Sequence, residues 1–134
     1  MSFKTALRAR VKNDPTIDAL IGKKDGAPAI DWRVRPQGFP YPSVVLQLIL
    51  GDRTQNMGGY DSTYQTTVDF VCSARSQPEA EALRDAVEAA VVPEATVGGI
   101  EFQRGQNITY IDGETNTDAG TVFREHVQIT FRHS

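Results

Sequence analysis

The feature that most constrains the fold is an apolar run, Phe39–Leu50, that begins with two prolines. Pro40 and Pro42 hold its start extended, because each proline ring restricts the preceding residue to β or polyproline geometry. From residue 44 onward Gln47 is the only polar member, and the run stops at Gly51. A strand with one buried face alternates, so this run predicts a central strand covered on both faces. A short buried helix is the alternative, which the β-branched content disfavours.

The composition predicts one soluble domain over residues 1–134. A chain of 134 residues buries about two-thirds of its unfolded surface. The net charge of −3 argues weakly against general nucleic-acid binding, which needs a basic surplus. Cys72 is the only cysteine, so we expect no internal disulfide and a reducing site of synthesis. We see no signal-peptide pattern and no run of about 18 apolar residues, and therefore expect neither export nor a membrane span.

Two helices are expected before the apolar run. Apolar side chains recur at four-residue spacing within residues 3–12, which predicts an amphipathic helix capped by Ser2. Asp14 and Pro15 suit the cap and first position of a shorter helix that Gly22 closes.

Two strands and a loop are expected around the apolar run. Lys23–Ala29 reads as a loop, and Ile30–Arg35 as a short edge strand with Trp32 on its core side. Thr63–Ser73 alternates apolar and polar residues, so it predicts a half-buried strand with Cys72 as an inert core thiol.

A long helix and further strands complete the predicted elements. Ser76–Glu79 is a capping box, and the helix that it starts is expected to reach about Val91. Val97–Arg104 and Thr121–Arg132 read as strands, and Ile108–Asp112 as an extended segment.

The order of elements predicts an α+β fold. We expect a mostly antiparallel sheet of four to five strands with two main helices packed on one face. Helices on one face leave the other face of the Phe39–Leu50 strand bare, whereas its sequence calls for cover on both. Oligomerisation would supply that cover.

Two polar segments interrupt the predicted strands. Gly51–Ser62 is too long for an ordinary hairpin turn and is rich in Gly, Asn and Asp, so we expect a loop that contacts a partner. Asp112–Gly120 is a second polar loop.

No residue pattern supports catalysis, a cofactor or a metal. The sequence holds no nucleophile elbow and no glycine-rich phosphate loop. His126 and His133 lack the further ligands that zinc needs. A calcium loop that started at Asp112 would need Gly at Thr117 and Glu at Phe123. A solvated acidic loop is the better interpretation, and we expect no enzyme.

Three segments carry a resemblance to a known family. They are Asp14–Gly22, Pro36–Gln47 and the strand-to-helix passage Val68–Leu83, followed by a terminal strand after a polar loop. In element order and approximate length, the chain resembles the tail-completion, or tail-terminator, proteins of long-tailed phages and gene transfer agents. It departs from the family pattern at Ser43, where an aromatic or apolar residue is common.

The resemblance implies a structural role as one tail-terminator-like domain. Such proteins form a ring, usually a hexamer, at the head-proximal end of the tail tube, where they stop tube polymerisation and join the head–tail connector. DNA passes through the lumen without sequence-specific binding. We would then expect this chain in the virion tail or neck, assembled in the bacterial host cytoplasm. The family brings no catalytic residues.

The ring hypothesis assigns the two polar segments to partner contacts, the first with more weight. The expected contact residues are Asp52, Arg53, Gln55, Asn56, Met57, Tyr60, Asp61, Asp112, Glu114, Asn116 and Asp118. Two alternatives stay open. One is a head-closure or connector component of the neck, and the other is a small module that binds single-stranded nucleic acid.

Overall fold

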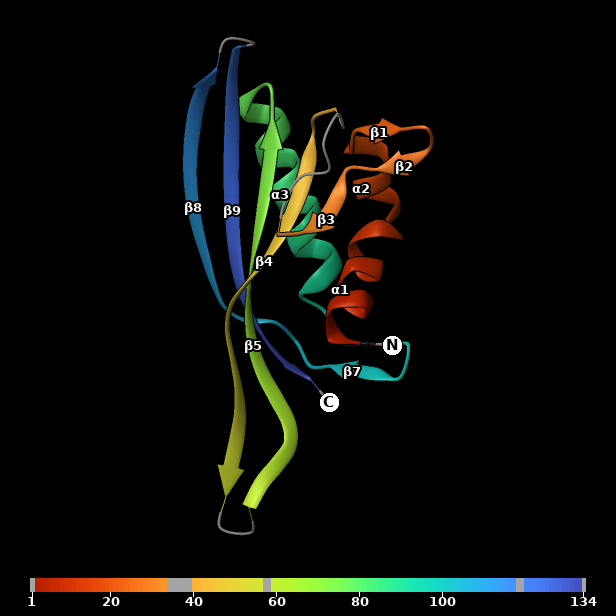
Figure 1. Ribbon diagram of the computed structural model, residues 1–134, viewed down its shortest axis with the longest axis vertical. Coiled ribbons are helices and arrows are strands. Elements are labelled where there is room, and N and C mark those ends of the chain that lie inside the picture. The colour runs from red at the N-terminus through yellow and green to blue at the C-terminus, as the bar shows by residue number, and fades with distance from the viewer. Residues whose placement is uncertain (1, 34–39, 57–58, 118–119, 134) are drawn as a thin grey trace.

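Figure 1 shows a computed structural model of the chain, which describes residues 2–33, 40–56, 59–117 and 120–133. Side chains are described for these residues except 52–63 and 117. The helices are α1 (Phe3–Lys12), α2 (Pro15–Leu20) and α3 (Gln77–Val91). The strands are β1 (Lys23–Lys24), β2 (Ala27–Pro28), β3 (Ile30–Trp32), β4 (Ser43–Asn56), β5 (Gly59–Ala74), β6 (Ala95–Val97), β7 (Ile100–Phe102), β8 (Gln106–Thr117) and β9 (Gly120–His133).

A polar side chain caps the start of each helix and accepts a hydrogen bond from the backbone amide three residues ahead. The donor–acceptor distance is 3.2 Å at Ser2 for α1, 3.0 Å at Asp14 for α2 and 3.4 Å at Ser76 for α3. Pro15 occupies the first turn of α2. These satisfied amides would otherwise be unpaired, so the three predicted helix starts are confirmed.

The main sheet has seven strands in the described chain, more than the four to five expected. The order is β3-β4-β5-β9-β7-β6, and β8 also pairs with β9. The β3–β4 pair is parallel and the other pairs are antiparallel. The expectation of a mostly antiparallel sheet is therefore correct, and its size was underestimated.

The extra strands come from short paired segments that the sequence analysis had placed within longer strands or loops. The predicted strand Val97–Arg104 is correct only at Ile100–Phe102, which forms β7 with Phe102 buried. Its start is wrong, because Gly98 and Gly99 turn the chain at φ of 57° and 82° between β6 and β7. The predicted loop Lys23–Ala29 contains the separate β1–β2 hairpin.

The largest correction concerns the two polar segments that were expected to be loops. The described residues of Gly51–Ser62 belong to the paired strands β4 and β5, with pairs such as Asp52 with Gln65 and Asn56 with Gly59. Asp112–Thr117 likewise forms the end of β8, and Gly120 begins β9. The two strands stay paired as far as Thr117 with Gly120. Cross-strand backbone hydrogen bonds override the weak strand propensity of Gly, Asn and Asp once the flanking strands are in register.

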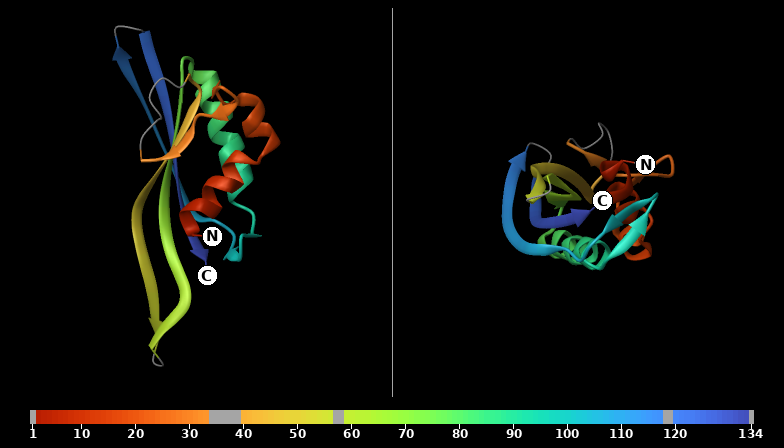
Figure 2. Two further views of the ribbon diagram at one scale, coloured as in Figure 1. Left: turned by 45° about the vertical axis from the view of Figure 1, so that its right-hand side comes forward. Right: turned by 90° about the horizontal axis from the view of Figure 1, so that it is seen from below.

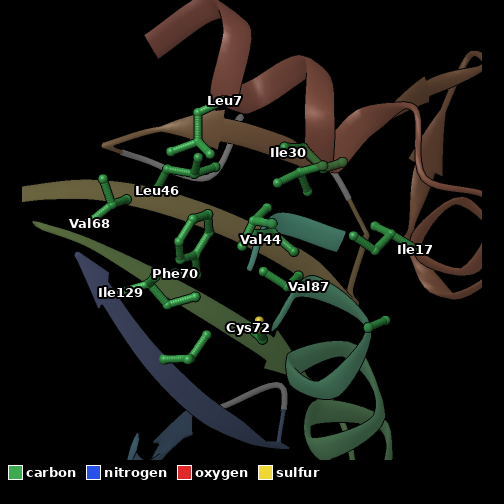
Figure 3. Close-up of a cluster of buried hydrophobic side chains, with 14 of the residues drawn as sticks. Leu7, Ile17, Ile30, Val44, Leu46, Val68, Phe70, Cys72, Val87 and Ile129 are labelled. Atoms are coloured by element: carbon green, nitrogen blue, oxygen red, sulfur yellow. The ribbon is translucent and has the colours of Figure 1, made fainter. Parts of the chain in front are cut away.

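All three helices lie on one face of the curled sheet, and the opposite face carries none (Figure 2). Figure 3 shows the core between these layers, to which each layer contributes fully buried side chains, for example Leu7, Ile17, Phe70 and Val87.

No helix of the described chain is both long enough and apolar enough to cross a membrane.

The Phe39–Leu50 run is only partly covered. Val44 and Leu46 of β4 are fully buried under the helices, which confirms a core strand. The expected cover on both faces is wrong further along, because Leu48, Ile49 and Leu50 are 48%, 52% and 63% exposed. There β4 and β5 pass beyond the helices and project from the body as a long hairpin (Figure 1).

Candidate interaction surfaces

The β4–β5 hairpin that projects from the body, here called the arm, carries the first set of expected contact residues. Its backbone pairs run from Gly51 with Thr66 to Asn56 with Gly59. Asp52, Arg53, Gln55, Asn56, Tyr60 and Asp61 all lie along these two strands, and Met57 lies outside the described residues. The arm is a paired ribbon that reaches away from the core (Figure 1).

The second set of expected contacts lies at the other end of the molecule. Asp112, Glu114 and Asn116 lie on β8, whose hairpin with β9 points away from the arm (Figure 1). Asp118 lies outside the described residues. The structure therefore does not bring the two predicted sets together into one site.

Residues of β8 and β9 form a charged cluster with the start of α3. Asp112 and Glu114 line a pocket of about 220 Å³ together with Gln77 and Phe123. Beside it Glu125, only 2% exposed, accepts a hydrogen bond from Gln77 and one of 3.3 Å from Arg84. The positive end of α3 also favours a carboxylate here. These partners explain how a charge is tolerated in the core.

Tyr110 extends this cluster along β8. Its hydroxyl donates a hydrogen bond to Glu88 of α3, and the Arg84 guanidinium lies 5.1 Å from the centre of its ring. The hydrogen bond to Glu88 raises the pKa of the Tyr110 hydroxyl. The ring itself stays 52% exposed. Tyr110 therefore joins β8 to α3 and still presents an apolar surface.

A cleft lies at the opposite edge of the sheet, beside β4 where β3 ends. Its volume is about 430 Å³, and it is lined by Lys4, Arg33, Gln47, Leu48 and Ile49. The backbone amide of Arg33 donates a hydrogen bond of 2.8 Å to the carbonyl of Leu46. Arg33 has a φ of 75°, and this left-handed conformation ends β3. Two basic side chains and two exposed apolar ones thus share one concave surface.

The central strands β5 and β9 carry polar side chains on the helix-free face of the sheet. The carboxylate of Asp69 lies 3.0 Å from Nδ1 of His126, and the hydroxyl oxygens of Thr67 and Thr130 lie 2.8 Å apart. Arg124 also lies on this face, because β9 alternates its side chains. These pairs tie neighbouring strands together without a helix above them.

The two histidines lie on opposite faces, so they do not converge on a metal. His126 is on the helix-free face, whereas His133 bonds the Thr66 hydroxyl at 2.8 Å and stacks on Phe3 at 4.0 Å. The described residues hold no group of three His, Cys, Asp or Glu that could bind a metal. Cys72 is fully buried, and this burial raises the pKa of its thiol.

Comparison with known proteins identifies the family of this chain. The sequence profile of Tail completion protein gp17 matches residues 5–133. This chain belongs to that family. No curated protein matches the sequence closely enough to show kinship.

Solved structures show the same fold as this tail completion protein. One is a chain of the "Virion of native gene transfer agent (GTA) particle", with a TM-score of 0.58 and 16% identity over 98% of this chain and 94% of that chain. A second chain has a TM-score of 0.56 and 14% identity over 99% of this chain and 97% of its own length. At these identities the likeness concerns the fold.

Membership in the tail completion family makes this chain a structural protein of a phage tail, which agrees with the expectation of no enzyme. It also directs attention to surfaces that the sequence reading missed. Ile49, Tyr110 and Ile111 were not among the expected contacts, yet they are among the exposed large hydrophobic side chains of the described chain. The signal was available in part, because the uninterrupted apolar run to Leu50 already required more cover than two helices supply.

Proposed function

We propose that this chain is the tail terminator, which forms a ring, hexameric as the family resemblance implies, on the head-proximal end of the tail tube. The ring stops tube polymerisation and joins the tube to the head–tail connector, and DNA passes through its lumen without sequence-specific binding. The protein acts in the virion tail and neck and assembles in the bacterial host cytoplasm. Family membership over residues 5–133 is the finding that best supports this role.

Two structural features support contact with several partners at once. The arm reaches beyond the helices at one end, and the β8–β9 hairpin projects at the other (Figure 1). A protein that sits between a tube and a connector needs separate surfaces for each. Between these ends, exposed apolar side chains such as Leu50 and Ile111 lie along the two edges of the sheet, where neighbouring copies can make contact.

The test adds purified protein to tail tube protein while the tubes polymerise. A terminator shortens the distribution of tube lengths and leaves extra density at one end of each tube, as seen by electron microscopy. The control is an equal amount of a chain that lacks the arm. Tubes of unchanged length would contradict the proposal. Unchanged tubes together with binding to the connector would favour the head-closure alternative.

The nucleic-acid alternative has less support in the structure. Arg124 and His126 lie on the helix-free face of β9, whereas Phe131 is fully buried on the other. Single-strand binding needs aromatic and basic side chains interleaved on one exposed face.

A further inference from the structure

The main sheet ends in two open edges that both carry exposed apolar side chains. On one side, β3 pairs with β4 only as far as Leu46, and no strand of the described chain flanks β4 beyond it. On the other side, β8 pairs only with β9 among the described strands. In the described chain six large hydrophobic side chains are exposed, and five of them lie here, three on β4 and two on β8. Open apolar edges of this kind pair with other chains unless something covers them.

The geometry points to a specific ring contact: the β4 edge of one copy docks beside the β8 edge of the next. The β4 edge comprises Leu48, Ile49 and Leu50 with the neighbouring Lys4 and Arg33, and the β8 edge comprises Tyr110, Ile111, Asp112 and Glu114. This inference rests on the proposed ring and names the surfaces that build it. The occupant of each edge is therefore a second copy of this chain.

Strand directions fit this pairing. β4 is antiparallel to β5, β5 to β9 and β9 to β8, so β4 and β8 of one copy run in opposite directions. A rotation axis that runs along the strands preserves these directions in every copy. The β4 strand of one copy then meets the β8 strand of the next as an antiparallel neighbour, which a sheet accommodates with ordinary hydrogen bonds.

The side chains of the two edges also face matching sides of the sheet. Leu48 is paired with Val68 and Tyr110 with Val127, both of which point into the helix-covered core. Leu50 is paired with Thr67, on the helix-free face, since a register shift separates it from Leu48. The other members of the edges, Ile49 at that shift and Ile111 opposite His126, add apolar surface.

The apolar residues of the two edges lie at different heights in one copy. Across the sheet Tyr110 is level with Leu46, two residues before Leu48. Copies in a closed ring share one height along its axis, so contact between the apolar parts requires strands that tilt away from that axis. A sheet that closes on itself has such a tilt, together with a stagger of register.

Charge complementarity favours a contact between a β4 edge and a β8 edge over a contact between two β4 edges or two β8 edges. Lys4 and Arg33 line the cleft beside Leu48, and Asp112 and Glu114 continue β8 beyond its apolar pair. A β8–β8 contact would place carboxylates against carboxylates, and a β4–β4 contact would oppose the basic side chains. Like charges in contact cost free energy, whereas the mixed contact neutralises them. The interface is thus head-to-tail and can close into a ring.

Thiol cross-linking tests the inference, because exposed positions are available and the native Cys72 is buried. The double variant Leu50→Cys/Ile111→Cys is treated with a short bismaleimide, both free in solution and on tube ends. It is expected to yield a ladder of covalent oligomers that stops at the ring size. The yield should exceed that of either single variant about ten-fold, since a formed interface raises the effective concentration of the two thiols. Unchanged thermal unfolding checks that the variants are folded.

Other outcomes separate this inference from the proposed function. A ring that forms without any ladder from the double variant would overturn the edge pairing and leave the terminator role intact. Dimers from Leu50→Cys alone or Ile111→Cys alone would show like-edge pairing and also overturn it. A ladder in a protein that leaves tube length unchanged would support the edge pairing and remove the terminator role. A wild-type chain that is monomeric both in solution and on tubes would remove both.

Discussion

Glu125 places a carboxylate on the helix-facing side of β9, where the neighbouring side chains Val127 and Ile129 are fully buried. Its charge is balanced by Arg84 and by the amide of Gln77. Burying an ion costs several kcal/mol, which a close partner offsets. Removing that partner leaves the cost without the compensation, so the pair is a sensitive point in the fold.

We expect Arg84→Leu to lower the free energy of unfolding by about 3 kcal/mol, since it leaves Glu125 charged, buried and without its cation. Urea denaturation measures the change. The matched control is Asp85→Ala, which removes the other carboxylate that contacts Arg84, at 3.1 Å and 66% exposed. An exposed pair contributes about 0–1 kcal/mol, so equal losses in the two variants would contradict this account of Glu125.

Cys72 offers a pH-dependent readout of core burial. Burial raises the pKa of its thiol, so the folded chain keeps the proton while the unfolded chain loses it above about pH 8.5. Rising pH therefore favours the unfolded state. Above pH 8.5 we expect the stability advantage of the wild type over Cys72→Ala to shrink, at a rate that approaches about 1.4 kcal/mol per pH unit by pH 10. A difference that does not change with pH, or rapid labelling of the native thiol, would show that Cys72 is not sealed in the core.

At the scale of elements, the arm consists of two strands that pair with each other beyond the helices. Among the side chains of β4 and β5 that the structure describes, fully buried apolar ones such as Val44, Leu46 and Phe70 lie in the part of the sheet that the helices cover. An isolated two-stranded ribbon is at best marginally stable in water. We therefore expect the arm to add little to the stability of the domain.

We expect a chain in which Asn-Gly replaces residues 54–63 to unfold within about 1 kcal/mol of the wild type, because the core is untouched. Asn-Gly favours the tight turn that joins the Arg53–Tyr64 pair. The same chain should lose its effect on tube length. A control with Asp25→Asn, at the turn between β1 and β2, should retain it. Full activity of the shortened chain would show that the arm makes no essential contact.

At the scale of the whole molecule, the layers leave parts of the sheet uncovered. Three helices cover one face of a curled sheet, and the long strands outrun this cover at both ends (Figures 1 and 2). The sheet does not close on itself in the described chain, because β4 and β8 each keep an open side. The proposed ring would cover both open edges by one repeated contact.

Charge at these edges predicts that self-association weakens as salt rises. Between about 0.1 M and 1 M salt the Debye length falls from about 10 Å to 3 Å, which screens Lys4 and Arg33 from Asp112 and Glu114. The dissociation constant measured by sedimentation should rise a few-fold, as exposed pairs of this kind are worth about 0–1 kcal/mol. A Lys4→Gln/Arg33→Gln variant should bind more weakly at low salt and lose most of this dependence. Tighter association at high salt in the wild type would indicate an interface without charge pairing.

The polar segments show most clearly where prediction from the sequence stopped. Asp112, Glu114 and Asn116 alternate with Gly113 and Thr115, a period of two that fits a strand, yet their polarity favoured a loop. Gly51–Ser62 gave even less sign of pairing, because hydrogen bonds to Thr66 and its neighbours decide its structure. Contacts expected there remain predictions.

The amino-acid sequence by itself determined the helix starts at Ser2, Asp14 and Ser76, the core strands around Val44 and Phe70, and the family. These depend on local chemistry: caps within one turn, alternation within one strand and short-range order of elements. Tertiary structure alone decided the length of the arm, the seven-stranded pairing and which apolar side chains stay outside. Such features depend on backbone groups far apart in the chain, whose hydrogen bonds form irrespective of side-chain type, so local residue patterns carry little record of them.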